Sequence, residues 1–260
     1  MENTLRSWVV KCATLVVAAS VTPSAAEPQP SKALPFMVGE RFTYRVSVAK
    51  LGTVGRGAMW IEGPSEIRGV STWLLRFDFS ASKGPIKAVD RTSSWLDPDR
   101  MATQRYSKHE KHLLAHRDER VELFPSEQRW VASTGENGIS PTDAPLDELS
   151  FMYFIRTLPL EANATYRFSR HFDSRRSPTS VTVVKREPVT TGAGTFQTIL
   201  VEMRVKDPRR YKGEGVIRIN LTDDSVRIPV RIVSGMPVIG TATMTLESYN
   251  NPAERELAKL

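Results

Sequence analysis

Apolar and polar residues alternate along most of the sequence after Phe36, and this period of two constrains the fold more than any other feature. Such alternation is typical of a β-strand that buries one of its two faces. The clearest runs are 42–48, 72–79, 199–206, 217–221, 226–232 and 241–247, and weaker runs occupy 54–62, 87–96, 101–108, 115–123, 127–133, 164–172 and 179–187. Because successive runs begin about ten residues apart, they predict a meander of antiparallel neighbours. We expect residues 134–146 to form a loop that divides the strands into two groups, and Gly235-Met236-Pro237 to precede a final hairpin.

One segment departs from this rhythm and predicts a helix over residues 147–158. Asp147 and Glu148 suit a helix N-terminus, Arg156 suits the last turn, and Pro159 marks the end. Apolar side chains cover most of the circumference, so the helix should be buried on several sides. The expected fold is therefore mainly β: a strongly curved antiparallel sheet, or an incomplete β-barrel or sandwich, with one packed helix.

The N-terminus has the layout of an export signal. Arg6 and Lys11 precede an apolar run from Cys12 to Val21, and Ser24-Ala25-Ala26 provides a small-residue end. We expect a cleaved signal peptide at 1–26, an extended leader at 27–35, a single β-rich domain at 36–250 and a C-terminal tail at 251–260. Other apolar runs are too short to span a membrane, so any membrane association should be peripheral.

The single cysteine, Cys12, lies within this signal segment. Its removal would leave a chain without thiols, which excludes intrachain disulfides, Cys-ligated metals and Cys nucleophiles. An exported chain without cysteine fits the periplasm of a Gram-negative bacterium better than a eukaryotic exterior.

Positive charge is in excess: 36 Lys and Arg face 29 Asp and Glu. Removing Glu2, Arg6 and Lys11 leaves 34 basic and 28 acidic residues, a net charge of +6. No aromatic residues interleave the basic ones as in a nucleic-acid-stacking surface, so we expect no nucleic-acid partner. The surplus suits a solvated surface or the anionic lipids of a bacterial envelope.

Three of the four histidines, His109, His112 and His116, fall within eight residues and form the strongest candidate metal site. On a helix they would share one face and could hold zinc or copper. On strands, alternation would place His112 and His116 together and His109 on the opposite side. Because Lys108, Lys111, Arg117 and Arg120 surround them and would repel a cation, we favour a polar hairpin edge and expect no metal or other cofactor.

Catalytic signatures are weak elsewhere. The sequence contains no Gly-x-Ser-x-Gly motif. The acidic pairs Asp97/Asp99 and Asp223/Asp224 could serve a glycosidase, but their surroundings indicate turns. Catalytic residues are therefore not identified, and we lean towards a protein that is not an enzyme.

Several short motifs resemble a bacterial exported family, domain of unknown function 3108. They are Pro35-Phe36, Gly39-Glu40, Tyr44, Asp147-Leu149-Ser150, Tyr153, Arg156-Thr157-Leu158-Pro159-Leu160, Thr191-Gly192-Ala193-Gly194-Thr195-Phe196, Val201-Glu202 and Asp224–Ile232 followed by Gly240. Asn220-Leu221-Thr222 departs from the aromatic residue that this family often shows before the acidic turn. The family has no agreed activity, so the resemblance implies no site residues. Its closing strands are also similar in pattern to envelope lipoprotein carriers, whose curved half-barrels hold acyl chains; this is an analogy of architecture.

A curved sheet of this size either fills its concave face or leaves a ligand cavity there. We therefore expect a periplasmic binding or carrier protein for an amphipathic or anionic envelope component, such as a lipid or glycolipid. The expected pocket residues are Phe42, Tyr44, Trp73, Phe77, Phe151, Phe154, Met203 and Met244, with Arg204, Lys206 or Arg227 meeting a phosphate or carboxylate. The alternatives are an envelope structural or protein-interaction module and a hydrolase acting on envelope glycan or lipid.

Overall fold

The computed structural model describes residues 34–49, 51–84, 86–112, 115–208, 211, 213–236 and 240–257. The expected signal peptide, Cys12 and most of the leader lie outside the described residues. The strands are β1 (Arg41–Val48), β2 (Gly52–Ile67), β3 (Val70–Lys83), β4 (Ile86–Asp97), β5 (Ala102–His112), β6 (Ala115–Phe124), β7 (Arg129–Ala132), β8 (Asn137–Ile139), β9 (Thr165–Phe168), β10 (Thr179–Thr191), β11 (Gly194–Lys206), β12 (Glu214–Thr222), β13 (Pro229–Met236) and β14 (Gly240–Asn250). The α-helices are α1 (Glu148–Phe154) and α2 (Pro252–Leu257), and short 3-10 turns are η1 (Pro125–Glu127), η2 (Ile155–Thr157) and η3 (Ser174–Arg176).

All strands of the described part belong to one antiparallel sheet in the order β8-β7-β6-β5-β4-β3-β2-β1-β14-β13-β12-β11-β10-β9. Each half of the chain is a meander, and the halves join where β1 pairs with β14, with Tyr44 opposite Leu246. The predicted meander and final hairpin are therefore confirmed. The segment 134–146 is not entirely a loop, because β8 lies within it and pairs with β7.

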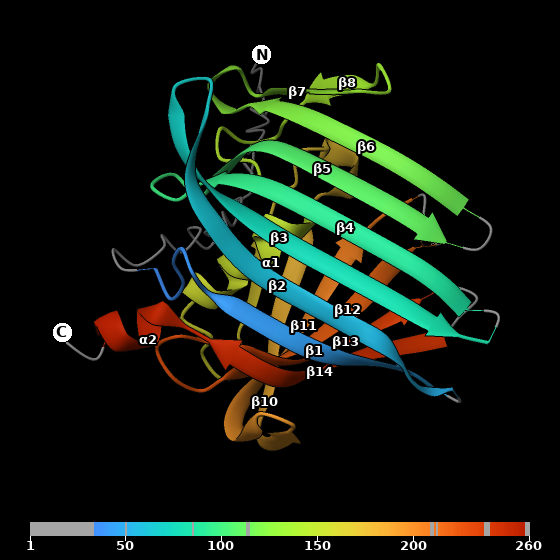
Figure 1. Cartoon of the computed structure of the whole chain (residues 1–260). Helices are drawn as coiled ribbons and strands as arrows, with labels where there is room; N and C mark the ends of the chain where they lie inside the picture. The colour runs from blue at the N-terminus through green and yellow to red at the C-terminus, as the bar shows by residue number, and fades with distance from the viewer. Residues whose placement is uncertain are drawn as a thin grey trace, which may run out of the picture.

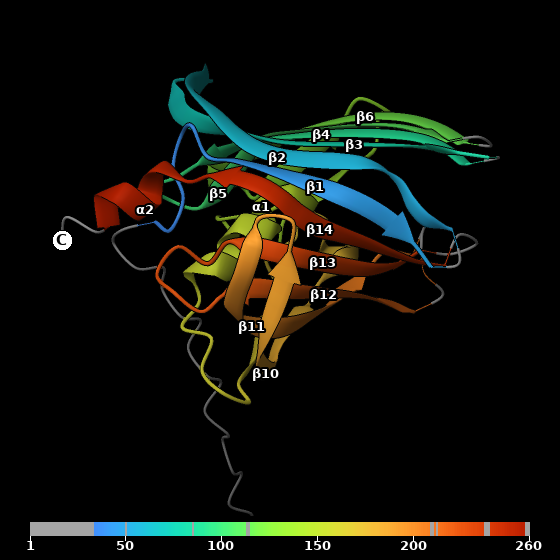
Figure 2. The same cartoon turned by 60° about the horizontal axis from the view of Figure 1, so that its bottom comes forward.

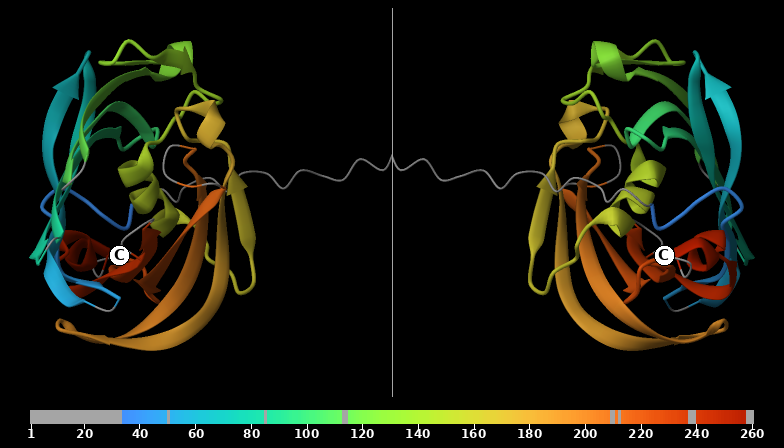
Figure 3. Two further views of the ribbon diagram at one scale, coloured as in Figure 1. Left: turned by 90° about the vertical axis from the view of Figure 1, so that its right-hand side faces the viewer. Right: turned by 90° about the vertical axis from the view of Figure 1, so that its left-hand side faces the viewer.

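The sheet curves strongly around α1 (Figure 1). Strands β2–β6 lie on one side of the helix and β10–β13 on the other (Figure 2). Seen from the side, the helix sits inside the curve (Figure 3). Register shifts promote this bending, since a bulge adds local twist. They fall at Thr43/Tyr44, Val46/Ser47, Glu62/Ser65, Trp95/Leu96, Val183/Lys185 and Asn220/Leu221. The sheet is not closed, because β8 and β9 end the strand order without pairing with each other. The predicted curved sheet with one packed helix is thus confirmed.

Helix α1 is fixed at its N-terminus by a buried capping box. The Asp147 carboxylate accepts hydrogen bonds from the backbone N–H groups of Leu149 and Ser150 at 2.8 and 3.0 Å, and the Ser150 hydroxyl accepts one from the Asp147 N–H at 2.9 Å. Ser94 on β4 and Thr103 on β5 also donate to Asp147, at 2.5 and 2.9 Å. One side chain therefore both starts the helix and attaches it to the concave face of the sheet.

The other end of the helical segment is held by a buried ion pair. Arg156 in η2 makes a bidentate contact with Glu40, at 2.7 and 2.8 Å, and both side chains are almost completely buried. Its guanidinium also donates to the carbonyl oxygens of Pro35 and Val226, at 3.0 and 2.9 Å. Arg156 thereby ties the helical segment to the approach to β1 and to the turn before β13.

Candidate functional site

The concave face contains a cavity beside α1. Two adjoining hollows of about 150 and 210 Å³ share Lys108, Glu148, Met152 and Ile217 as lining residues. We call the pair the inner cavity; their combined volume lies just inside the lower end of the range of roughly 300–1,000 Å³ seen for ligand pockets. Three other hollows, of about 450, 520 and 360 Å³, are each larger than either part of the inner cavity. The first of these lies on the convex face, where Arg56, Asp78 and Arg91 border it.

One wall of the inner cavity is apolar and rich in methionine. Its apolar residues come from β2, β3, β12, β13, β14 and α1: Met59, Phe77, Met152, Ile217, Ile232 and Met244. Alternation along each strand brings the strand residues to the concave face, where they lie at the edge of the packed core: Met59 and Ile232 belong to that core, and Phe77, Met152, Ile217 and Met244 pack against it. Flexible thioether chains adapt to ligands of different shape, so this wall can accept an apolar chain.

The opposite wall is charged and centres on Glu148, the first residue of α1. Its carboxylate forms an ion pair with Arg176, which also lies 3.3 Å from Asp207. Lys108 on β5 borders the same space and pairs with Glu110 at 2.8 Å. Enclosure opposes ionisation of Glu148, but Arg176, Lys108 and His171 hold its pKa well below the ordinary value. Glu148 is therefore an anion inside the curve of the sheet.

Three polar atoms that border the inner cavity have no hydrogen-bond partner of ordinary geometry among the described residues: Oε2 of Glu148, Nε2 of His171 and the hydroxyl of Tyr106. His171 is brought there by a bridge between Leu146 and His171, and burial lowers its pKa to about 4, so the ring is neutral near pH 7. The backbone N–H of Asp173 donates to Nδ1 of His171 at 3.0 Å. The proton of the neutral ring must then be on Nε2. The cavity thus offers one acceptor, Glu148 Oε2, and two donors, His171 Nε2–H and the Tyr106 hydroxyl.

Five of the residues expected from the sequence line the inner cavity. Phe77 and Met244 contribute to the larger hollow, and Phe151, Met203 and Lys206 contribute to the smaller one. Lys206 lies at the end of β11 with its Nζ 3.5 Å from the carbonyl oxygen of Ser177.

Four expected aromatic residues do not line it, because they belong to the core beneath the helical segment. Phe42, Tyr44 and Phe154 have no exposed surface. The Tyr44 hydroxyl donates to the carbonyl oxygen of Pro229 at 2.9 Å. Trp73 packs edge-on against Phe36 with ring centroids 6.2 Å apart. At this end of the concave face, α1 and η2 fill the space that the sequence interpretation assigned to a ligand.

Two expected cationic residues also lie elsewhere. Arg204 is adjacent to Met203 in β11 and therefore points to the convex side, where it pairs with Glu202 at 2.8 Å. Arg227 has a positive φ of 52° in the turn before β13, and its Nε donates to the carbonyl oxygen of Asp224 at 3.0 Å. Neither is among the residues that border the inner cavity, so the structure does not bring these two arginines together with the other expected ligand contacts.

Sequence reasoning missed the charged wall. A signal was present in β5, where Tyr106, Lys108 and Glu110 occupy inward positions that a fully packed sheet would fill with apolar residues. No local pattern identified His171 or Arg176, because only the tertiary fold brings the 170–176 segment against α1.

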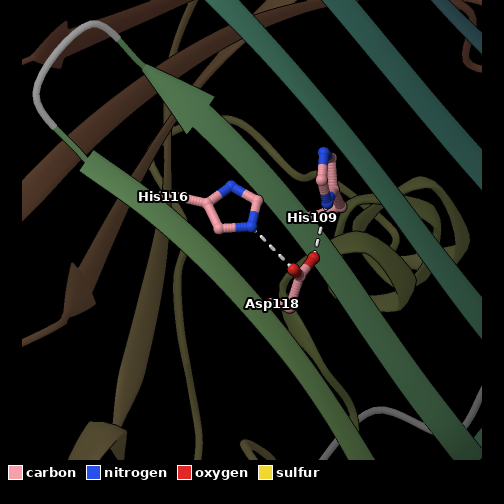
Figure 4. Close-up of side chains that lie close together, drawn as sticks. All are labelled: His109, His116 and Asp118. Carbon is pink, nitrogen blue, oxygen red and sulfur yellow. Dashed lines mark hydrogen bonds and ion pairs between the residues drawn. The ribbon is translucent and has the colours of Figure 1, made fainter.

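The histidines of the β5–β6 hairpin adopt a different arrangement from the one expected (Figure 4). Register pairs His109 with Asp118 and Lys111 with His116, so His109, His116 and Asp118 share the convex face. The expectation that His109 would point away from His116 is wrong, because the hairpin reverses the chain and directly opposed residues of β5 and β6 share a face. The side chain of His112 lies outside the described residues.

The acidic pairs considered for a glycosidase have structural partners. Asp97 Oδ1 accepts from the backbone N–H groups of Asp99 and Arg100 at 3.0 and 3.2 Å, and Asp224 Oδ1 accepts from those of Val226 and Arg227 at 3.0 and 2.9 Å. Both act as turn caps, as the sequence indicated.

The fold and cavity define an open, strongly curved antiparallel β-sheet protein with a helix in its concave face. Within this class, residues 43–247 match the model of a protein family of unknown function, DUF3108, and the chain belongs to that family. The predicted resemblance is confirmed. No curated protein matches the sequence.

Comparison with solved structures finds three matches, of which the first has a TM-score above 0.5. A β-barrel-like protein of the domain of unknown function DUF1849 from Brucella abortus shares 13% identity, with a TM-score of 0.53 and coverage of 83% of this chain and 98% of that one. A presumed exported protein with a YmcC-like fold from Bacteroides fragilis shares 13% identity, with a TM-score of 0.31 and coverage of 84% and 99%. A presumed lipoprotein from Parabacteroides distasonis shares 12% identity, with a TM-score of 0.31 and the same coverage. Among the residues that the structure describes, no helix has the length and apolar character needed to cross a membrane.

Proposed function

We propose that this protein is a periplasmic binding or carrier protein for an amphipathic molecule of the bacterial envelope. The observation that carries the proposal is the inner cavity, whose two walls differ in chemistry. Methionines and Phe77 form the wall for an apolar chain, whereas Glu148 and His171 offer unpaired polar atoms opposite. A site with an apolar body and a few convergent polar groups is typical of small-ligand recognition.

The polar wall favours a head group that bears hydroxyls over one that is simply anionic. Glu148 Oε2 needs a hydrogen-bond donor, and His171 Nε2–H needs an acceptor. A sugar hydroxyl can serve as either. A phosphate or carboxylate would face the ionised Glu148, and Arg176 is already paired with Glu148 and Asp207. The ligand class we favour is therefore a glycolipid or a comparable hydroxyl-bearing amphiphile.

A displacement assay tests both the cavity and the head group. Purified, delipidated protein is loaded with the fluorescent apolar probe N-phenyl-1-naphthylamine and titrated with octyl glucoside or octanoate, which share a chain length and differ in head group. Octyl glucoside should displace the probe at lower concentration. Stronger displacement by octanoate would contradict the head-group assignment, and failure of the probe to bind would defeat the carrier proposal.

A cavity-filling variant provides the matched structural test. Met152→Trp adds bulk between the two hollows, whereas Val184→Trp adds the same side chain at a position that is 43% exposed on β10. We expect Met152→Trp to weaken probe binding at least tenfold and Val184→Trp to leave it unchanged. Mass spectrometry of lipids that co-purify with the parent and with each variant then identifies the natural ligand.

Export to the periplasm is a separate part of the proposal and rests on the N-terminal pattern of charge, apolar run and small residues. N-terminal sequencing of protein from a periplasmic fraction should begin at Glu27. Recovery of the chain in the cytoplasm with residues 1–26 intact would contradict it.

A further inference from the structure

Two imidazoles and one carboxylate converge on the convex face, away from the inner cavity. Asp118 in β6 lies between them: its Oδ1 is 2.5 Å from Nδ1 of His109, and its Oδ2 is 2.8 Å from Nε2 of His116. One ligand atom from each residue lies within 4.8 Å of the other two. These are the donor types that zinc, copper(II) and nickel(II) prefer in proteins.

The scaffold beneath these groups is regular. Asp118 stands directly opposite His109 in the β5–β6 ladder. His116 lies two residues N-terminal to Asp118 in β6, so its side chain points to the same face. The two rings meet edge to face with centroids 5.2 Å apart (Figure 4). The side chains of His109, His116 and Asp118 are 39%, 57% and 63% exposed, so an ion and its waters can reach all three.

The charges around this cluster are less hostile to a cation than the sequence suggests. Lys108 and Arg117 point to the concave side and pair with Glu110 and Glu119. Arg120 shares the convex face but pairs with Glu122 at 3.1 Å. Two further cations on the same face are Arg91, in register with His109, and Lys111, in register with His116. Both have long side chains that can turn towards solvent.

We propose that His109, His116 and Asp118 form a binding site for a divalent transition-metal ion. Tetrahedral zinc with ligands at about 2.0–2.2 Å needs donor atoms about 3.4 Å apart. The present His–Asp contacts are shorter than that, so the ion would enter by replacing these two hydrogen bonds. Small side-chain rotations at exposed positions suffice, and water completes the coordination shell. Two nitrogen donors disfavour magnesium, which prefers oxygen ligands.

Isothermal titration of the untagged mature chain, residues 27–260, with ZnCl₂ tests the site, because a histidine tag or the Cys12 thiol would itself bind zinc. We expect saturable binding of one ion, and at least tenfold weaker binding in His109→Gln and in His116→Gln. Asp118→Asn should also weaken binding, whereas Asp143→Asn, which changes another exposed aspartate, should not. MgCl₂ should give no binding heat.

Nuclear magnetic resonance of the imidazole C–H groups supplies a second measurement that does not depend on the variants. Zinc should shift the signals of His109 and His116 and leave that of the buried His171 unchanged. Absence of zinc binding by the parent chain would overturn the proposal. Equal binding by the parent and both histidine variants, or loss of binding in His112→Gln but not in His116→Gln, would overturn it as well.

Discussion

Replacing Arg156 by methionine should be among the most destabilising single changes in this protein. The substitution removes a buried cation and keeps an unbranched side chain of similar length. Arg156 makes two hydrogen bonds to Glu40 and one each to the carbonyl oxygens of Pro35 and Val226. Its loss leaves the Glu40 carboxyl without its counter-ion in a position that is 1% exposed.

The magnitude follows from that burial. Removing one partner of a buried ion pair typically costs about 3–5 kcal/mol, because the remaining charge is neither solvated nor paired. Burial already raises the pKa of Glu40 above its ordinary value despite Arg156, so Glu40 can take up a proton in the variant and limit the cost. We therefore expect a loss of about 3–4 kcal/mol for Arg156→Met. The double variant Glu40→Leu/Arg156→Met should recover about 2 kcal/mol of it, since no charge is then left unpaired.

Equilibrium unfolding in urea, followed by tryptophan fluorescence and circular dichroism, measures these differences. Arg100→Met is the matched control: Arg100 is 45% exposed and pairs with Asp143, which is 65% exposed, so its removal should cost less than about 1 kcal/mol. A loss below about 1 kcal/mol for Arg156→Met would refute the reasoning. So would a double variant whose loss equals the sum of the two single losses.

Three further predictions concern stability and ligand binding. Burial raises the pKa of Asp147 to about 6 and lowers that of His171 to about 4. Between pH 4 and 6, Asp147 therefore makes the free energy of unfolding fall as pH rises, whereas His171 makes it rise. Each contribution is about 3 kcal/mol. We expect the urea midpoint of His171→Asn to fall from pH 4 to 6 and that of Asp147→Asn to rise over the same range. If the pH dependence of the midpoint were the same in both variants as in the parent, these pKa values would be contradicted. Gly55→Ala should destabilise the protein by more than about 1 kcal/mol, because an added Cβ would lie 1.8 Å from the carbonyl oxygen of Ser80 and must push β2 away from β3. The control in the same unfolding assay is Gly213→Ala, whose added Cβ meets nothing within 4 Å. Glu148→Gln should weaken octyl glucoside binding by several fold, measured by the displacement assay, with Glu161→Gln at an exposed position as the control; equal binding would remove Glu148 from the ligand site.

The sequence predicted the strands and the helix because both depend on local periodicity. It also predicted that turns would hold Asp97 and Asp224, since an aspartate next to a chain reversal caps local backbone N–H groups. It failed at the hairpin histidines, where the face of each residue depends on cross-strand register and not on spacing along the chain. It also could not separate Phe77, which borders a cavity, from Phe42, which lies in the core, because inward residues of both kinds obey the same alternation.

The motifs that carry the family resemblance have structural roles in this fold, and this bears on where function should be sought. Asp147 and Ser150 form the capping box of α1, and Glu40 and Arg156 form the buried ion pair at the other end of the helical segment. Both motifs fix the helix inside the curved sheet, and the helix in turn presents Glu148 and Met152 to the inner cavity. A protein could keep this framework and change its ligand by altering only the cavity residues, since none of the four framework side chains except Asp147 borders that space. Among related chains, the residues at the positions of Glu148, Met152 and His171 should therefore change with the chemistry of the ligand. The residues of the capping box and of the buried ion pair should stay the same wherever the fold is kept.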